Sequence, residues 1–149
     1  MKKMSLFIIL ISVSTLLKAQ QLMTKDQQRV QKTVVELFEA LSNRDSVSLK
    51  TYSTTDISLY EYGQVWNRDT LIRKGITMNY ATDFKRTNTF NFINTITDKK
   101  TAWVTYRLSS ATTKDGIHET VNWLETVILA KEKKRWKVKH LHSTLIKRS

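Results

Sequence analysis

The chain has 149 residues, and its 25 lysines and arginines against 13 acidic residues give a formal net charge of +12. That length suits a single domain, and 40% hydrophobic with 26% charged residues is the composition of a globular protein rather than a disordered one. Cysteine is absent and glycine occurs only three times, which excludes disulfides, thiolate nucleophiles, zinc–cysteine sites and the glycine-rich loops that bind phosphates or dinucleotides.

The first 19 residues follow the order of a secretory signal peptide, with two lysines, an apolar run over residues 5–17, and a small residue at Ala19. The apolar run covers 13 residues, whereas a helix that spans a bilayer needs about 20. We therefore predict an exported protein, periplasmic or secreted, in which residues 1–19 are removed and residues 20–149 form the domain. Cleavage after Gln20 and a retained amphipathic anchor are the alternatives.

The segment after the signal peptide has the periodicity of an amphipathic helix. Thr24 and Gln27 are spaced as a capping box. The apolar residues that follow recur at intervals of three and four: Val30, Val34, Leu37, Phe38 and Leu41. This pattern predicts a helix over residues 25–42 that ends near Asn43, and Asp45 can cap a short second helix.

A strand and a third helix are predicted next. Residues 56–62 have the pattern of a strand that ends at Gly63. Asn67 or Asp69 can then cap a short helix that ends around residues 75–78. The first half of the domain is therefore expected to be mainly helical.

From Phe84 onward, apolar and polar residues alternate in four runs, as in β-strands that bury one face. Turns at residues 98–100, 115–116 and 133–134 separate these runs. Helices followed by an antiparallel meander predict an α+β fold, in which the amphipathic first helix covers the apolar concave face of a curved sheet.

Two of the turns predict which residues face each other across the sheet. A two-residue turn at 115–116 sets Tyr106 opposite Glu125, and a turn at 133–134 sets Glu125 opposite His142. Polar side chains are the exceptions on this apolar face, and five of them are expected there: Asn94, Tyr106, Glu125, His140 and His142. The sequence thus predicts a row of a phenol, a carboxylate and an imidazole on three neighbouring strands.

Three interpretations of this row stay open. It is a polar patch that satisfies itself by hydrogen bonds, a set of groups that binds a ligand without chemistry, or an acid–base site. In the acid–base site, His142 is the base and Glu125 orients it. Tyr106 or Asn94 then donates to a developing oxyanion. We expect an adjacent imidazolium to keep Glu125 ionised. A metal site that adds His140 ranks lowest, so no cofactor is expected.

Large aromatic residues form a second group of candidates. Trp123 falls on the inner face, and Tyr60, Tyr62 and Trp66 lie near the first strand and the third helix, so the four can line a pocket that binds a planar or apolar ligand. A purely structural place in the core is the alternative. Trp103 and Arg107 fall on the opposite face of the sheet, where they suit a homodimer interface.

Positive charge is concentrated near the C-terminus. Residues 131–149 hold eight lysines and arginines against one glutamate, a net charge of +7. A solvated hairpin face is one interpretation, and weak contact with an anionic surface through this basic C-terminal hairpin is the other. No aromatic stacking motif lies among these lysines, so nucleic acid is not an expected partner.

Three short segments resemble the nuclear transport factor 2-like (NTF2-like, or SnoaL-like) superfamily, in particular its exported bacterial members. They are LSNRD at residues 41–45, VWNRD at 65–69, and the terminal run RWKVKHLHS at 135–143. The resemblance implies a cone-shaped α+β fold with a pocket at its open end, often dimeric through the sheet. Members of the superfamily include isomerases, dehydratases, hydrolases and non-catalytic binding proteins. The acidic residue and the phenol of its steroid isomerases match no local motif in this chain.

Together these observations predict an exported pocket protein that binds a small organic ligand. An enzyme of the lyase or isomerase type, using His142 and Glu125, is the first alternative. A protein-interaction module that uses the outer face of the sheet and the basic hairpin is the second.

Overall fold

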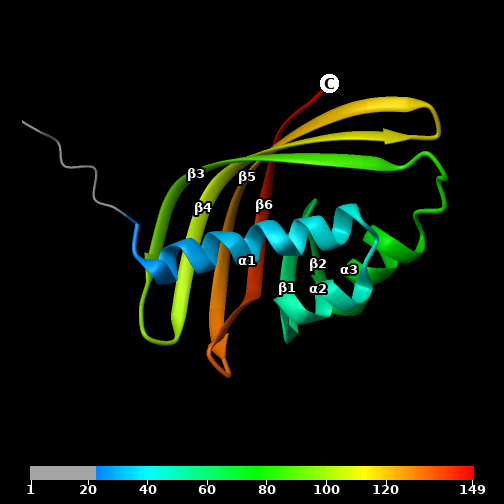
Figure 1. The fold of residues 1–149 in the computed structure, drawn as a ribbon. Helices are drawn as coiled ribbons and strands as arrows, with labels where there is room; N and C mark the ends of the chain where they lie inside the picture. The colour runs from blue at the N-terminus through cyan, green and yellow to red at the C-terminus, as the bar shows by residue number, and fades with distance from the viewer. Residues whose placement is uncertain (1–22) are drawn as a thin grey trace, which may run out of the picture.

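The computed structural model describes residues 23–149, in which helices come first and long strands follow (Figure 1). The predicted signal peptide lies outside the described residues. The elements are α1 Lys25–Ser42, α2 Ser46–Tyr52, β1 Ser53–Glu61, β2 Gln64–Asn67, α3 Arg68–Ile72, the π-helical segment η1 Arg73–Thr77, β3 Lys85–Thr97, β4 Thr101–Lys114, β5 Ile117–Glu132 and β6 Arg135–Arg148. In residues 23–149, none of the helices has the length and hydropathy needed to cross a membrane.

The six strands form one curved, unclosed sheet in the order β2-β1-β6-β5-β4-β3. β1 runs parallel to β6, and every other neighbouring pair is antiparallel. Figure 1 shows α1 lying across the bent strands β3, β4 and β5, with α2 and α3 beside it. The predicted α+β fold, with helices packed on a curved and mainly antiparallel sheet, is therefore confirmed.

Local side-chain chemistry sets the helix ends as predicted. The Thr24 hydroxyl accepts a hydrogen bond from the Gln27 N–H at 3.2 Å, and the Gln27 side-chain oxygen accepts one from the Thr24 N–H at 2.8 Å. This capping box satisfies two backbone donors at the start of α1. Asp45 caps α2 through two backbone N–H groups, and Asn67 rather than Asp69 caps α3.

The apolar stripe of α1 and the inner residues of the sheet form one core. Val34 and Leu37 of α1 are buried together with Val104 of β4 and Val127 of β5. Each such side chain stabilises the fold by about 1.5–3 kcal/mol relative to an exposed one. The helix is therefore held on the concave face by the hydrophobic effect rather than by its own propensity.

The turn between β4 and β5 has the predicted geometry. Asp115 and Gly116 both adopt positive φ angles, 52° and 74°, which suit the twist of a two-residue hairpin. This turn sets Tyr106 opposite Glu125, as predicted. The two side chains therefore share the inner face of the sheet.

The predicted pairing of Glu125 with His142 is wrong. A register shift in β6 makes Lys139 an extra residue, so that His140 pairs with Ile128 and Glu125 pairs with Ser143. A bulge of one residue moves every later side chain to the other face, because side chains alternate along a strand. His140 and His142 consequently lie on the outer face, while Ser143 takes the inner position.

The predicted inner position of Asn94 is wrong for the same reason. The register of β3 against β4 shifts between Phe92 and Asn94. Thr95 becomes the buried residue after the shift, and Asn94 is exposed. Ile93 is the extra residue of this bulge, and it is exposed as well.

Candidate functional site

A cavity of about 350 Å³ lies between the helices and the concave face of the sheet. Leu37 and Phe38 of α1 and Leu71 of α3 line one side, and inner residues of the sheet line the other. Lys74 of η1 and Lys114 of β4 also line the cavity, so it reaches the end of the sheet at which β4 turns into β5. The helices cover the open concave face and leave this space between the two layers.

Three of the four aromatic residues predicted to line a pocket do so, whereas Tyr60 packs against His140 and His142 on the outer face. Tyr62, Trp66 and Trp123 all line the cavity. The rings of Tyr62 and Trp123 meet edge to face, with centroids 5.2 Å apart. Trp123 is largely buried and Tyr62 is exposed, so the pair runs from the cavity toward solvent and offers a flat apolar ligand two ring surfaces.

Glu125 is a buried polar residue in the cavity wall. Its side chain is only 3% exposed. The Ser143 hydroxyl donates to its Oε1 atom at 2.8 Å, whereas its Oε2 atom has no hydrogen-bond partner. A buried polar atom without a partner costs about 1–3 kcal/mol. Glu125 of the cavity wall therefore has a buried oxygen without a partner, beside the Tyr106 hydroxyl, which lacks one as well.

Tyr106 lies beside Glu125 but does not line the cavity. It is fully buried, and its hydroxyl has no hydrogen-bond partner. Burial, together with the charge of Glu125, raises the pKa of Tyr106 well above its ordinary value. The phenol is therefore neutral and is part of the core behind the cavity wall.

Burial also controls the charge of Glu125. Desolvation raises the pKa of Glu125 from its ordinary value of 4.5 to about 7, and the nearby charge of Glu61 acts in the same direction. Burial likewise raises the pKa of Glu61, which lines the same cavity. The prediction that an imidazolium keeps Glu125 ionised is therefore wrong, because no histidine shares its face of the sheet. The carboxyl is substantially protonated at neutral pH.

Arg86 of β3 supplies a cation to the same cavity. Its guanidinium carbon lies 5.4 Å from the centre of the Phe84 ring. Its Nε atom is buried without a hydrogen-bond partner, and within residues 23–149 no carboxylate lies close enough to form an ion pair with it. Burial lowers the pKa of Arg86, and the charges of Tyr62 and Glu61 oppose that effect.

Two other cations that line the cavity, Lys74 and Arg148, already have partners. Lys74 donates to Gln64 at 3.0 Å and lies 4.3 Å from the centre of the Trp66 ring. Arg148 donates to Glu119 at 3.0 Å and to the Tyr62 hydroxyl at 2.7 Å. Arg86 differs from these two because its Nε atom is buried and its guanidinium has no hydrogen bond or ion pair within residues 23–149.

The predicted histidines lie together on the other side of the sheet. Ser58 of β1 lies 2.8 Å from Nδ1 of His140. The ring of Tyr60 packs edge to face against both His140 and His142, with centroids 4.7 and 5.7 Å away. In the described part of the chain, no three His, Asp or Glu side chains are close enough to hold a metal ion.

Sequence reasoning missed three polar residues near the Glu125 carboxyl or in the cavity wall: Glu61, Arg86 and Ser143. Arg86 has a detectable signal, because it alternates with Asn88, Phe90 and Phe92 on one face of a predicted strand. Glu61 has no such signal in the sequence, because it reaches the cavity through the parallel pairing of β1 with β6.

Comparison with known proteins agrees with this architecture. A model of the SnoaL-like domain family matches residues 30–146. Among solved structures, a ketosteroid isomerase-like protein from Erwinia carotovora atroseptica is 14% identical, with a TM-score of 0.68, over 84% of this chain and 99% of that one. No curated protein matches the sequence.

Two further structures have the same fold. An NTF2-like protein from Cytophaga hutchinsonii is 15% identical, with a TM-score of 0.66, over 83% of this chain and all of that one. A CamKII hub homology domain from Chlamydomonas reinhardtii is 19% identical, with a TM-score of 0.70, over 83% of this chain and all of that one. At such identities the likeness shows the fold alone. Because the family model matches most of its length, the chain belongs to the SnoaL-like family of the NTF2-like superfamily.

Proposed function

We propose that this protein binds a small organic ligand in the cavity beneath α1 without transforming it. One observation carries the proposal: the Glu125 carboxyl, in the wall of a cavity lined by both apolar and polar residues, has an oxygen without a partner. Ligand sites are usually apolar hollows of about 300–1,000 Å³ with a few polar groups that orient the ligand. A neutral Glu125 can both donate and accept a hydrogen bond.

Catalysis by a His142–Glu125 pair is not proposed, because the two residues lie on opposite faces of the sheet. All three histidines lie outside the residues that line the cavity. Tyr106 is sealed behind the wall and is not placed to polarise a bound group. Binding without turnover requires none of these groups.

Filling the cavity tests the proposal. Val121 lines the cavity, and Leu124 lies three residues further along β5 on the outer face. We expect Val121→Phe to weaken binding of the apolar dye 1-anilinonaphthalene-8-sulfonate at least tenfold, because the added ring occupies ligand space. Leu124→Phe should leave dye binding unchanged. Equal dye binding by both variants and the unmodified protein would contradict ligand binding in this cavity, provided circular dichroism shows both variants folded.

We also propose that two copies of the chain associate through the outer face of the sheet. Trp103, Leu124 and Ile128 are exposed there on neighbouring strands, Trp103 by 43%. Exposed apolar residues in such a group favour burial against a partner. Sedimentation equilibrium of the unmodified protein and Trp103→Glu tests this, since only the unmodified chain is expected to have twice the monomer mass.

Export remains a proposal that rests on the sequence of residues 1–19. Cleavage after Ala19 would leave only five residues before α1 begins at Lys25. The N-terminal sequence of the protein recovered from the cell envelope should therefore begin at Gln20. A chain that still begins with Met1 would contradict cleavage.

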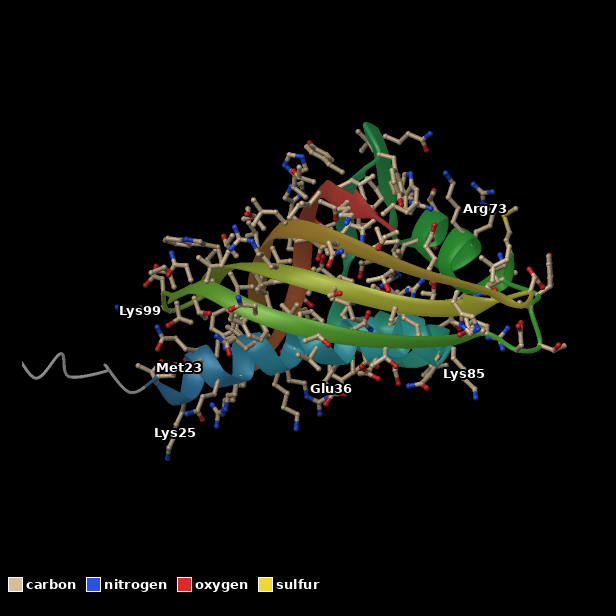
Figure 2. All side chains as sticks on the ribbon, turned by 90° about the horizontal axis from the view of Figure 1, so that it is seen from above. Met23, Lys25, Glu36, Arg73, Lys85 and Lys99 are labelled. Carbon is tan, nitrogen blue, oxygen red and sulfur yellow. The ribbon has the colours of Figure 1, made fainter. Side chains whose placement is uncertain are left out.

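We further propose that the exported protein touches anionic lipid through one end of the sheet. The Lys131 N–H donates to the Lys100 carbonyl at 2.8 Å, which joins the β3–β4 and β5–β6 turns. Lys131 also forms an ion pair with Asp26 in the first turn of α1. Figure 2 shows Lys25 and Lys99 at this end, whereas Arg73 and Lys85 lie at the other. We call the turn residues Lys99, Lys100, Lys133, Lys134 and Arg135 the basic tip.

The basic tip lies away from the residues at the mouth of the cavity. Lys74 and Lys114 line the cavity near Arg73 and the β4–β5 turn, at the end opposite to Lys99 in Figure 2. A protein seated on lipid through the basic tip would keep its cavity open to solvent. The side chains of Lys133 and Lys134 are exposed and so are accessible to phosphate head groups.

A further inference from the structure

We infer that the ligand of this cavity carries a carboxylate, and that the guanidinium of Arg86 binds it. The inference rests on the proposed ligand-binding function and assigns a chemical class to the ligand. Arg86 lines the cavity, and its Nε atom is buried without a hydrogen-bond partner. A donor that is cut off from water, such as this Nε atom, costs free energy unless an acceptor compensates it. Within residues 23–149 no carboxylate pairs with this guanidinium.

The position of Arg86 is set by its strand and by an aromatic neighbour. Arg86 and Asn88 share the inner face of β3 with Phe90. The Phe84 ring lies 5.4 Å from the guanidinium carbons of both Arg86 and Arg44. Arg44 is itself fixed by hydrogen bonds to two backbone carbonyls, at 2.8 and 3.0 Å. Arg86 is therefore positioned by packing, while its donors stay available to a ligand.

A carboxylate fits the surroundings better than a phosphate does. A guanidinium presents parallel N–H donors that match the two oxygens of a planar carboxylate. Glu61 lines the same cavity, so its carboxylate would repel a dianionic phosphate more strongly than it repels a singly charged carboxylate. One carboxylate would supply the opposite charge and the hydrogen-bond acceptors that the half-buried Arg86 guanidinium lacks.

The other residues that line the cavity indicate the chemistry of the rest of the ligand. Trp123 and Leu108 offer an apolar wall, and Phe38 extends it from α1. The protonated Glu125 can donate a hydrogen bond to a second polar group of the ligand. The structure thus points to a compact organic acid with an apolar, preferably aromatic, body.

Matched acids and amides test this assignment. We would titrate the protein with 4-phenylbutyrate and with its neutral analogue 4-phenylbutyramide, and follow the fluorescence of Trp123 and the other tryptophans at pH 6.5. The acid should bind at least tenfold more tightly than the amide, because a hydrogen bond to a charged group is worth more than a neutral one. In Arg86→Gln this preference should disappear. In Arg73→Gln, which removes an exposed arginine outside the lining, it should persist.

The outcomes distinguish failure of the carboxylate assignment from failure of the proposed ligand-binding function. Equal binding of acid and amide to the unmodified protein would overturn the carboxylate assignment while leaving ligand binding in place. A preference that survives in Arg86→Gln would remove Arg86 from the assignment. If neither compound binds and the dye does not bind either, the proposed function itself fails. Should Arg86→Gln not fold, Arg86→Lys keeps the charge without the parallel donors, and a preference reduced by at least threefold is then expected.

Discussion

Replacing Glu125 with glutamine should make the protein more stable at pH 8 and change its stability little at pH 4.5. The pKa of Glu125 rises from 4.5 to about 7 in the folded chain. Below pH 4.5 the carboxyl is protonated in both the folded and the unfolded chain, so it contributes no penalty. As the pH rises from 4.5 toward 7, the unfolded chain gains stability by ionising, and the folded chain does not until its own pKa is reached.

The difference between those two pKa values corresponds to roughly 3 kcal/mol of stability that is lost between about pH 4.5 and pH 7. Glutamine has nearly the same shape, can still accept from Ser143 and does not ionise. Urea unfolding of the unmodified protein and of Glu125→Gln at pH 5, 6, 7 and 8 measures the effect. Glu39→Gln, an exposed position on α1, is the matched control.

Other titrating groups do not obscure this comparison. Burial lowers the pKa of His140, which makes the folded protein gain stability with rising pH in the same range. The contribution of His140 is the same in the unmodified protein and in Glu125→Gln, so it cancels in the difference between their free energies of unfolding. A difference in stability that is the same at pH 5 and pH 8 would contradict a protonated Glu125 in the fold.

Reversing the charge of three residues in the basic tip should abolish adsorption to anionic vesicles. The proposed variant changes Lys133, Lys134 and Arg135 to glutamate. Each basic residue near an anionic membrane contributes about 1 kcal/mol, so loss of three predicts at least about a 100-fold weaker partition, and the added repulsion increases the effect. Binding of the unmodified protein should also weaken steeply with salt.

The measurement is co-sedimentation with vesicles of phosphatidylglycerol and phosphatidylcholine at several salt concentrations. A control variant reverses Lys50, Arg73 and Lys85, which are exposed and lie outside the basic tip. It changes the net charge equally and should keep most of the binding. The glutamate substitutions replace one non-glycine residue with another at the two positions of the turn that have positive φ angles, Lys133 and Lys134. The backbone strain of the turn is therefore the same in the unmodified protein and in the basic-tip variant. Equal loss in the two variants would point to net charge alone, and unchanged binding would exclude the basic tip.

The sequence by itself determined the elements whose causes are local. The capping box at Thr24, the cap at Asp45 and the turn at Asp115–Gly116 depend on residues within a few positions of each other. The pairing of Tyr106 with Glu125 followed from that one turn. The aromatic lining also followed, since Trp123 takes its inner position by simple alternation. The fold class was predictable because these local patterns agree with one another.

Only the tertiary structure decided the composition of the site. The extra residue Lys139 exchanges His142 for Ser143 on the inner face. The sequence carries a trace of it, because the apolar residues of β6 change from the even positions of Trp136 and Val138 to the odd position of Leu141, but the turn alone does not place the extra residue. The parallel pairing of β1 with β6 brings Glu61 to the cavity from a distant part of the chain. Arg86 reaches the same cavity from the opposite edge of the sheet. A sheet side chain changes face when one residue is inserted, so the faces beyond a bulge depend on the packing of the whole sheet rather than on local sequence.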